Sequence, residues 1–329
     1  ALVAWPSHRL PCNRVGFCNA TCTFATSTAT KLSNKSQLPG AALSRADPAA
    51  WPTDPMRRLL MISSYVANDP VGLTATIPPL LAAGIDVVGL PTVVLSNHPV
   101  RAHIAGITLD PRLLSDMVRA LEDNGWLASF DAIFSGYLPS MQHVEVVAAA
   151  VKRLRTIRSE ITYVCDPIFG DDPGGLYIDE RSAHGIRDLL LPLADVLTPN
   201  RFELSWLSGI DVRSPADARA AIARLGRPIV AGTSIPDGPD VLATVLAAQG
   251  DAFIGRVDKW SNVPHGTGDV FAGCLTAKLM HGESPQNALA YALAGVRSAL
   301  EASRGIDHLL PSFVDWRRDI EPVSVSPLT

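Results

Sequence analysis

The chain has 329 residues, of which 47% are hydrophobic and 18% charged, and its formal net charge is -4 at pH 7. This length allows one large α/β domain or two ordinary ones, and the apolar content is sufficient for a sizeable buried core. The charge balance gives no basic field for nucleic acid or anionic lipid, and no apolar run is long enough to cross a bilayer. We therefore expect neither a nucleic-acid partner nor a membrane.

The first 55 residues differ in composition from the rest of the chain. They are rich in Ser, Thr, Ala and Pro, contain no acidic residue before Asp47, and show neither helical nor strand periodicity. We predict a disordered N-terminal extension over residues 1–55 and one folded domain over residues 56–329. The segment could instead be an organelle-targeting peptide. A third interpretation, which we prefer, is that these residues lie upstream of the true start codon, because the first methionine is Met56.

From residue 57 onward, short apolar runs alternate with helix-like segments. Predicted strands cover residues 59–63, 85–90, 132–135, 161–165, 196–198 and 228–231, and a hairpin follows over residues 241–248 and 252–257. Predicted helices cover residues 73–83, 111–124, 141–155, 215–225, 270–281 and 285–303, and one more begins after Pro199. This alternation predicts the α/β class, a three-layer α/β/α sandwich with a mostly parallel central sheet.

Polar residues gather where several predicted strands end. They are Ser63 and Ser64, Gly136 and Tyr137, Asp166 and Asp171, the run from Thr198 to Glu203, and Thr233 with Ser234. Because ligands of open parallel sheets bind at the carboxyl ends of the strands, these loops predict one common site. The alternative for each loop taken alone is that its polar residue only caps the next helix.

The stretch from Pro264 to Asp269 reads P-H-G-T-G-D and leads directly into an apolar helical run. Backbone N–H groups at a helix N-terminus favour an anion, and glycine lets a phosphate approach them closely. A carboxylate would repel that phosphate, so Asp269 suggests a base that takes the proton of an attacking hydroxyl. We expect Asp269 to be ionised beside the helix N-terminus. The alternative is a Gly-rich turn with Asp269 as an ordinary N-cap.

This G-T-G-D sequence resembles the signature of the ribokinase-like superfamily of small-molecule kinases. Two further segments resemble the pyridoxal kinase branch: C-D-P-I-F-G-D at residues 165–171 and A-D-V-L-T-P-N-R-F-E at residues 194–203. The resemblance covers roughly residues 56–303, and its motifs follow the family order. It implies a ribokinase-like fold, Asp269 as the catalytic base, and an anion hole formed by Gly266, Thr267 and Gly268.

The resemblance also implies a site for ATP and Mg²⁺. In the family pattern, the residues that match Asn200 and Glu203 help to hold Mg²⁺ and its waters, and Asp166 and Asp171 match acids near the phosphates and the cation. Thr198 and Thr233 match hydroxyl residues that contact the nucleotide phosphates in the family, and Ser234 beside Thr233 is assigned with them. The alternative for Asp166 is a turn-initiating residue before a proline. A monovalent cation such as K⁺ is a further expected cofactor.

On the acceptor side, Ser64 matches a serine that binds the polar edge of the pyridine ring. Tyr137 matches a tyrosine that packs on a flat ring, and His98 belongs to an S-N-H segment of the family. For His98 a satisfied structural histidine is the favoured alternative. The chain departs from the family pattern at Tyr65, Leu95, Pro99 and Arg101, where the family has His, Phe, Thr and Tyr. These departures concern the acceptor.

The sequence thus predicts a cytoplasmic kinase that uses ATP to phosphorylate the 5′-hydroxymethyl group of pyridoxal, and possible further substrates are pyridoxine and pyridoxamine. The resemblance implies a homodimer. One alternative is a related kinase that acts on hydroxymethylpyrimidine or a sugar. The other is a non-catalytic vitamin-binding protein that retains the fold.

Overall fold

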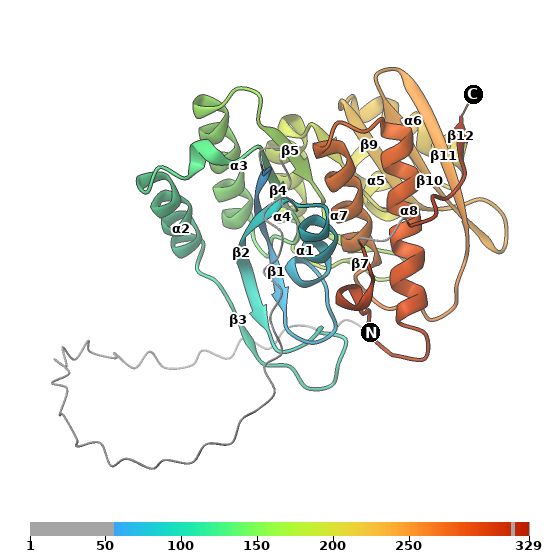
Figure 1. The fold of residues 1–329 in the computed structure, drawn as a ribbon, viewed down its shortest axis with the longest axis horizontal. Helices are drawn as coiled ribbons and strands as arrows, with labels where there is room; N and C mark the ends of the chain where they lie inside the picture. The colour runs from blue at the N-terminus through green and yellow to red at the C-terminus, as the bar shows by residue number, and fades with distance from the viewer. Residues whose placement is uncertain (1–55, 317–319, 329) are drawn as a thin grey trace, which may run out of the picture. The chain divides into compact units, whose positions relative to one another are not determined.

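The structure, a computed structural model, describes residues 56–316 and 320–328 (Figure 1). The predicted disordered extension over residues 1–55 lies outside the described residues. Among the described residues, no helix is both long enough and apolar enough to pass through a bilayer.

A ten-stranded sheet forms the centre of the described domain, in the order β12-β11-β10-β9-β8-β5-β4-β1-β2-β3. The strands are β1 (Arg58–Val66), β2 (Asp86–Leu95), β3 (Gly106–Thr108), β4 (Ala132–Ser135), β5 (Thr162–Cys165), β8 (Val196–Leu197), β9 (Ile229–Pro236), β10 (Val241–Ala248), β11 (Asp251–Asp258) and β12 (Val325–Pro327). From β9 to β2 all pairs are parallel, and antiparallel strands extend both edges. A separate hairpin joins β6 (Gly170–Asp171) to β7 (Gly175–Leu176).

Two layers of helices cover the sheet, because successive strand residues point to opposite faces. In β1, Leu60 and Ile62 join one buried cluster, while Leu59 and Met61 join the other. The first cluster lies under α2 (Pro111–Asp123), α3 (Met141–Ile157), α4 (Glu180–Gly185), α5 (Arg201–Ser208) and α6 (Pro215–Leu225). The second lies under α1 (Leu73–Ala82), α7 (Thr267–Met280) and α8 (Pro285–Ala302). Short helical turns complete the fold: η2 (Leu127–Ser129), η3 (Ile186–Leu190), η4 (Leu191–Leu193) and η5 (Pro311–Phe313).

The predicted three-layer α/β/α sandwich with a mostly parallel sheet is confirmed, but several element boundaries are corrected. β1 continues past Ser63 and Ser64, because a bulge lets it keep pairing with β2 as far as Val66. β9 runs through Thr233 and Ser234, since its antiparallel partner β10 extends it to Pro236. These serines and this threonine therefore lie within strands and not in the loops after them.

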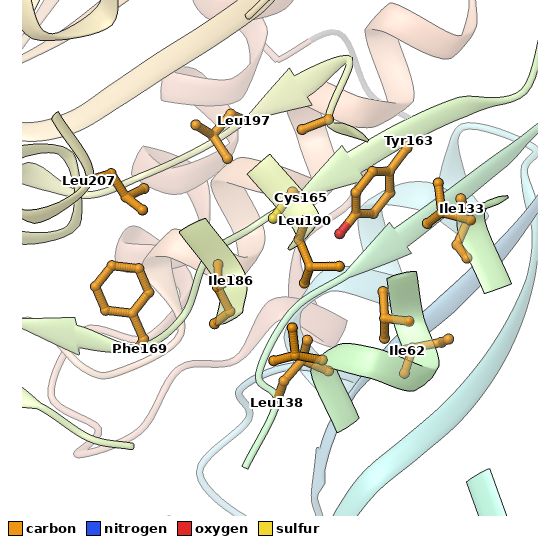
Figure 2. Packing of buried hydrophobic residues seen from close by; sticks show 14 of the residues in the cluster. Ile62, Ile133, Leu138, Tyr163, Cys165, Phe169, Ile186, Leu190, Leu197 and Leu207 are labelled. Atoms are coloured by element: carbon orange, nitrogen blue, oxygen red, sulfur yellow. The ribbon is translucent and has the colours of Figure 1, made fainter. Parts of the chain in front are cut away.

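The first buried cluster contains a polar contact between neighbouring strands. Tyr163 of β5 is fully buried among aliphatic side chains (Figure 2), and its hydroxyl lies 2.7 Å from Ser135 Oγ of β4. A buried hydroxyl without a partner costs free energy, so the two groups satisfy each other. This hydrogen bond joins β4 to β5 just below the loops that carry the polar residues described above.

We expect Tyr163→Phe to lower the free energy of unfolding by about 1–3 kcal/mol, because the Ser135 hydroxyl then loses its buried partner. Replacing both residues, with Tyr163→Phe and Ser135→Ala, should cost less than the sum of the single changes. Urea unfolding followed by circular dichroism measures all three variants, with the exposed Tyr65→Phe as control. Strictly additive losses would contradict the pairing.

Candidate active site

The polar loops predicted from the sequence come together at one edge of the sheet, because β9, β8, β5, β4 and β1 are neighbours in that order. Hydrogen bonds join them in turn. Thr233 N–H donates to the Pro199 carbonyl at 2.9 Å, and Thr198 Oγ1 donates to Asp166 Oδ1 at 2.8 Å. Tyr137 N–H donates to Ser63 Oγ at 3.1 Å. The ends of these strands therefore form one continuous polar floor.

A Gly-rich turn, residues 264–268, leads into α7 beside this floor. Gly266 is the N-cap of α7 with a φ of 97°, in the left-handed region, and a Cβ there would lie 2.3 Å from the Pro70 carbonyl oxygen. A Cβ at Gly268 would meet nothing within 4 Å. The first N–H groups of a helix have no partner within it, so the open space at this helix N-terminus suits an anion. Asp269 is the third residue of α7, so the alternative of an ordinary N-cap is wrong.

Asp269 is buried, with 7% of its surface exposed. Its Oδ1 has no hydrogen-bond partner within the described part of the chain, and neither has the hydroxyl of Thr76. Burial raises the pKa of Asp269 to about 6, and the Gly72 backbone N–H lowers it in part; the Thr76 hydroxyl lies near the carboxylate but outside hydrogen-bond geometry. The expectation of an ionised carboxylate therefore holds at neutral pH but not below pH 6, because burial outweighs the helix N-terminus.

Two further carboxylates, Asp166 and Glu203, are buried close by. Burial raises the pKa of Asp166 well above its ordinary value, and the neighbouring Asp269 raises it further. Burial, followed by the negative charge of Asp166, likewise raises the pKa of Glu203. The groups that lower these pKa values are the Thr198 hydroxyl and backbone N–H donors. Burial and the neighbouring carboxylates therefore disfavour the ionised forms of these acids, and a bound cation would favour them.

The residues predicted to bind the metal also have a structural task at the start of α5. Asn200 and Glu203 form a capping box: Glu203 N–H donates to Asn200 Oδ1 at 3.0 Å, and Asn200 N–H donates to Glu203 Oε2 at 2.9 Å. Phe169 N–H donates to the other Glu203 oxygen at 3.1 Å. No group of three or more His, Cys, Asp or Glu side chains in residues 56–316 and 320–328 is arranged to hold a metal alone. The role of Asn200 and Glu203 as metal ligands stays a prediction.

The other residues predicted to bind the nucleotide lie on the same side of the sheet. Thr233 forms a parallel bridge with Asn200, and Ser234 has a φ of 59°, in the left-handed region. Asp171 lies in the β6–β7 hairpin, where it raises the pKa of Tyr177 after the larger effect of burial. The carbonyl of Gly170 in this hairpin accepts from Asn200 Nδ2 at 2.8 Å. The hairpin is thus tied to the start of α5.

The predicted acceptor residues lie on the side of β1. Ser64 is buried against Gly72, where a Cβ would lie 2.2 Å from Ser64 Oγ. Tyr137 is partly buried, burial raises its pKa, and its carbonyl accepts from Thr92 Oγ1 at 2.8 Å. His98 stacks on His265 of the Gly-rich turn, with ring centroids 4.2 Å apart and an interplanar angle of 12°. Burial, then the charge of His265, lowers the pKa of His98 to about 4, so its ring is neutral.

A cavity of about 470 Å³ opens beside the Gly-rich turn. Its lining includes Asp69, Arg101, Pro264, His265, Asp307 and Leu309. Sequence reasoning singled out Arg101 only as a departure from the family pattern, and it missed Asp69, His265 and Asp307. The position of His265 directly before the Gly-rich motif was the available signal. No such signal pointed to Asp307, because it lies 206 residues from its partner Arg101.

Together these groups can support one kind of chemistry. An anion site at a helix N-terminus lies next to a buried carboxylate whose free oxygen can accept a hydrogen bond from a hydroxyl. Such an arrangement suits attack of an alcohol on a phosphoryl group, with the carboxylate taking the proton.

Comparisons with known proteins point in the same direction. A family model described as phosphomethylpyrimidine kinase matches residues 97–310. The pyridoxine/pyridoxal/pyridoxamine kinase of Bordetella avium is 34% identical over 265 residues, which are 77% of this chain and 89% of that protein. The pyridoxal kinase PdxY of Corynebacterium diphtheriae is 30% identical over 251 residues, 74% of this chain and 89% of that protein.

Comparison with a solved structure shows that the similarity extends to the fold. The pyridoxal kinase of Leishmania donovani, in complex with ADP and pyridoxamine, superposes with a TM-score of 0.78 at 31% sequence identity. The superposition covers 83% of this chain and 100% of that one.

The capping box predicts how Asn200 affects stability. We expect Asn200→Ala to cost about 1–2 kcal/mol of unfolding free energy, because the Glu203 N–H loses its acceptor. Asn200→Ser should recover most of this loss, since a serine hydroxyl also caps a helix. Urea unfolding of both variants checks this, and Ala and Ser variants of equal stability would contradict a capping role.

Proposed function

The chain belongs to the pyridoxal kinase family of the ribokinase-like superfamily, and on this premise we propose that it transfers the γ-phosphoryl group of ATP to the 5′-hydroxymethyl group of pyridoxal. The observation that carries the proposal is the buried, unpartnered Oδ1 of Asp269 in the first turn of α7. A buried acceptor without a donor is costly unless a ligand completes it. The hydroxyl of the substrate supplies that donor, and pyridoxal 5′-phosphate and ADP are the products.

Asp269 acts in this proposal as the general base. The acceptor oxygen attacks the γ-phosphorus, the bond to the β,γ-bridging oxygen breaks, and the hydroxyl proton passes to Asp269. The N–H groups of Gly266, Thr267 and Gly268 hold the charge that develops on the transferred phosphoryl group. Because Gly268 faces open space, the phosphoryl group can approach these donors without meeting a side chain.

The buried acids supply the cation side of the site. Mg²⁺ fits here because Asp166 and Glu203 are oxygen donors. Burial raises the pKa of both, and a neighbouring carboxylate raises each further, Asp269 for Asp166 and Asp166 for Glu203. Asp166, Asn200 and Glu203 would hold Mg²⁺, with Asn200 and Glu203 acting through bound waters because their own oxygens already accept backbone hydrogen bonds. When bound, the cation would neutralise phosphate charge of ATP. We assign the nucleotide phosphates to Asp171, Thr198, Thr233 and Ser234.

The acceptor ring is assigned to the side of β1. Ser64 would contact the polar edge of the pyridine ring, Tyr137 would pack on its face, and His98 would close the site from the β2–β3 side. The relatives named above include a pyridoxine/pyridoxal/pyridoxamine kinase, so all three vitamers belong in the substrate panel. The matching family model favours hydroxymethylpyrimidine as a second candidate acceptor. Phosphate transfer to each compound under ATP and Mg²⁺ discriminates between them.

A homodimer and a cytoplasmic location are part of the proposal. The edge of the sheet at β2 and β3 exposes the apolar side chains of Val94, Ile104 and Ile107, which a second copy would cover. In the described residues, Cys165 and Cys274 are free thiols, which suits a reducing compartment with ATP.

Replacing the proposed base should abolish most of the activity. We expect Asp269→Asn to lower kcat by about 10²- to 10⁴-fold, since the amide cannot take the hydroxyl proton. Formation of ADP and pyridoxal 5′-phosphate by the full chain measures this, and Asp258→Asn at an exposed position of β11 is the matched control. Activity of Asp269→Asn within a few-fold of the unmodified chain would refute the base.

The raised pKa of Asp269 predicts an acid limit of activity. Burial raises this pKa to about 6, so the base is ionised above pH 6 and takes up a proton as the pH falls through this value. We expect kcat/KM for pyridoxal to fall about tenfold per pH unit below about pH 6 and to level off above it. A profile that stays flat down to pH 5 would contradict the assignment.

A further inference from the structure

Arg101 uses its whole guanidinium group to join three separate segments. It lies in the β2–β3 loop, residues 96–105. Its Nε donates to Asp69 Oδ2 at 3.0 Å, and its Nη2 also bonds the other oxygen of Asp69. Its Nη1 donates to Asp307 Oδ2 at 2.6 Å, and Nη2 donates to the Asp307 carbonyl at 3.1 Å. The loop is thus tied both to the turn before α1 and to the segment after α8.

The Asp69 end of this network is buried. Asp69 is 5% exposed and has a φ of 58°, in the left-handed region. Arg101, and to a smaller extent the His98 backbone N–H, lower the pKa of Asp69 against the effect of burial. The neighbouring Asn68 N–H donates to the Ser96 carbonyl at 3.0 Å. One carboxylate therefore holds the loop at two points, His98 and Arg101.

The same loop contacts the catalytic turn through His98. Its ring stacks on His265 at 4.2 Å, and His265 directly precedes Gly266. Gly266 in turn packs on the Pro70 carbonyl, next to Asp69. The loop, the turn before α1 and the Gly-rich turn are therefore in contact with one another, and Arg101, Asp69 and His265 from these segments line the cavity of about 470 Å³.

We propose that Arg101 is a positioning residue that latches the β2–β3 loop across the acceptor side and thereby fixes His98 against the Gly-rich turn. This inference rests on the proposed function, since it concerns the site of the pyridoxal ring. The family pattern has tyrosine at the position of Arg101. The proposal explains how this chain keeps the loop in place with arginine instead. We expect the larger effect on the alcohol acceptor and not on ATP, because Arg101 itself bonds only Asp69 and Asp307, neither of which is assigned to the nucleotide.

The fork geometry of arginine supplies the test. Lysine keeps the charge but offers one nitrogen, which cannot bond both oxygens of Asp69 and reach Asp307 as well. We expect Arg101→Lys to raise KM for pyridoxal about tenfold and to leave KM for ATP within about twofold. Asp307→Ala removes the side-chain acceptor of Nη1, leaves the residue-307 carbonyl and the Asp69 pair in place, and should raise KM for pyridoxal about threefold. Arg119→Lys, which alters an exposed pair with Asp116 on α2, is the control and should change neither constant.

Hydrogen exchange of the full chain gives a second readout that does not depend on turnover. The amides of residues 96–105 should exchange faster in Arg101→Lys than in the unmodified chain, while those of α2 stay unchanged. Unaltered exchange, an unaltered KM for pyridoxal, or equal rises of both KM values would overturn the latch. If the unmodified chain formed no pyridoxal 5′-phosphate, the proposed function would fall, and the exchange rates would still decide whether Arg101 holds the loop.

Discussion

The burial of three neighbouring carboxylates is the constraint on which the rest of the site depends. All three carboxylates are buried: Asp269, Asp166 and Glu203. After the larger effect of burial, the charge of Asp269 raises the pKa of Asp166, and the charge of Asp166 raises the pKa of Glu203. Three neighbouring strand or helix ends must meet for this to occur, so the sheet order is a condition of the chemistry. Neutral donors hold the acids in place without supplying a positive charge, and under the proposed function the cation that accompanies a nucleotide would supply it.

Backbone contacts hold this arrangement in register. Gly266 touches the Pro70 carbonyl, Gly72 lies against Ser64, and Gly273 of α7 faces the Thr76 carbonyl of α1, where a Cβ would lie 2.7 Å away. The α1 and α7 segments therefore approach as closely as backbones allow. These two helices cover the same face of the sheet, so their close contact fixes the distance between the base and the turn before α1.

The sequence predicted the layers and the motif residues better than the contacts between distant loops. Alternating apolar runs were sufficient for the parallel strands, since a strand buried on both faces has a strong signal. β3 escaped detection because its three residues are exposed on the sheet edge, and β12 because it pairs only with β11. β1 and β9 extend as far as their partner strands β2 and β10 pair with them, and the local sequence of β1 or β9 carries no information about those partners. The Arg101 network joins residues that no motif connects.

The two glycines of the G-T-G-D motif are constrained by different partners. At position 266 the protein itself excludes a side chain, through the Pro70 carbonyl and the left-handed backbone. At position 268 no other residue of the described fold excludes a side chain, so under the proposed function the demand for glycine would come from the phosphoryl group that binds there. A library of variants selected only for folding would retain the first glycine and accept small residues at the second, whereas selection for turnover would retain both.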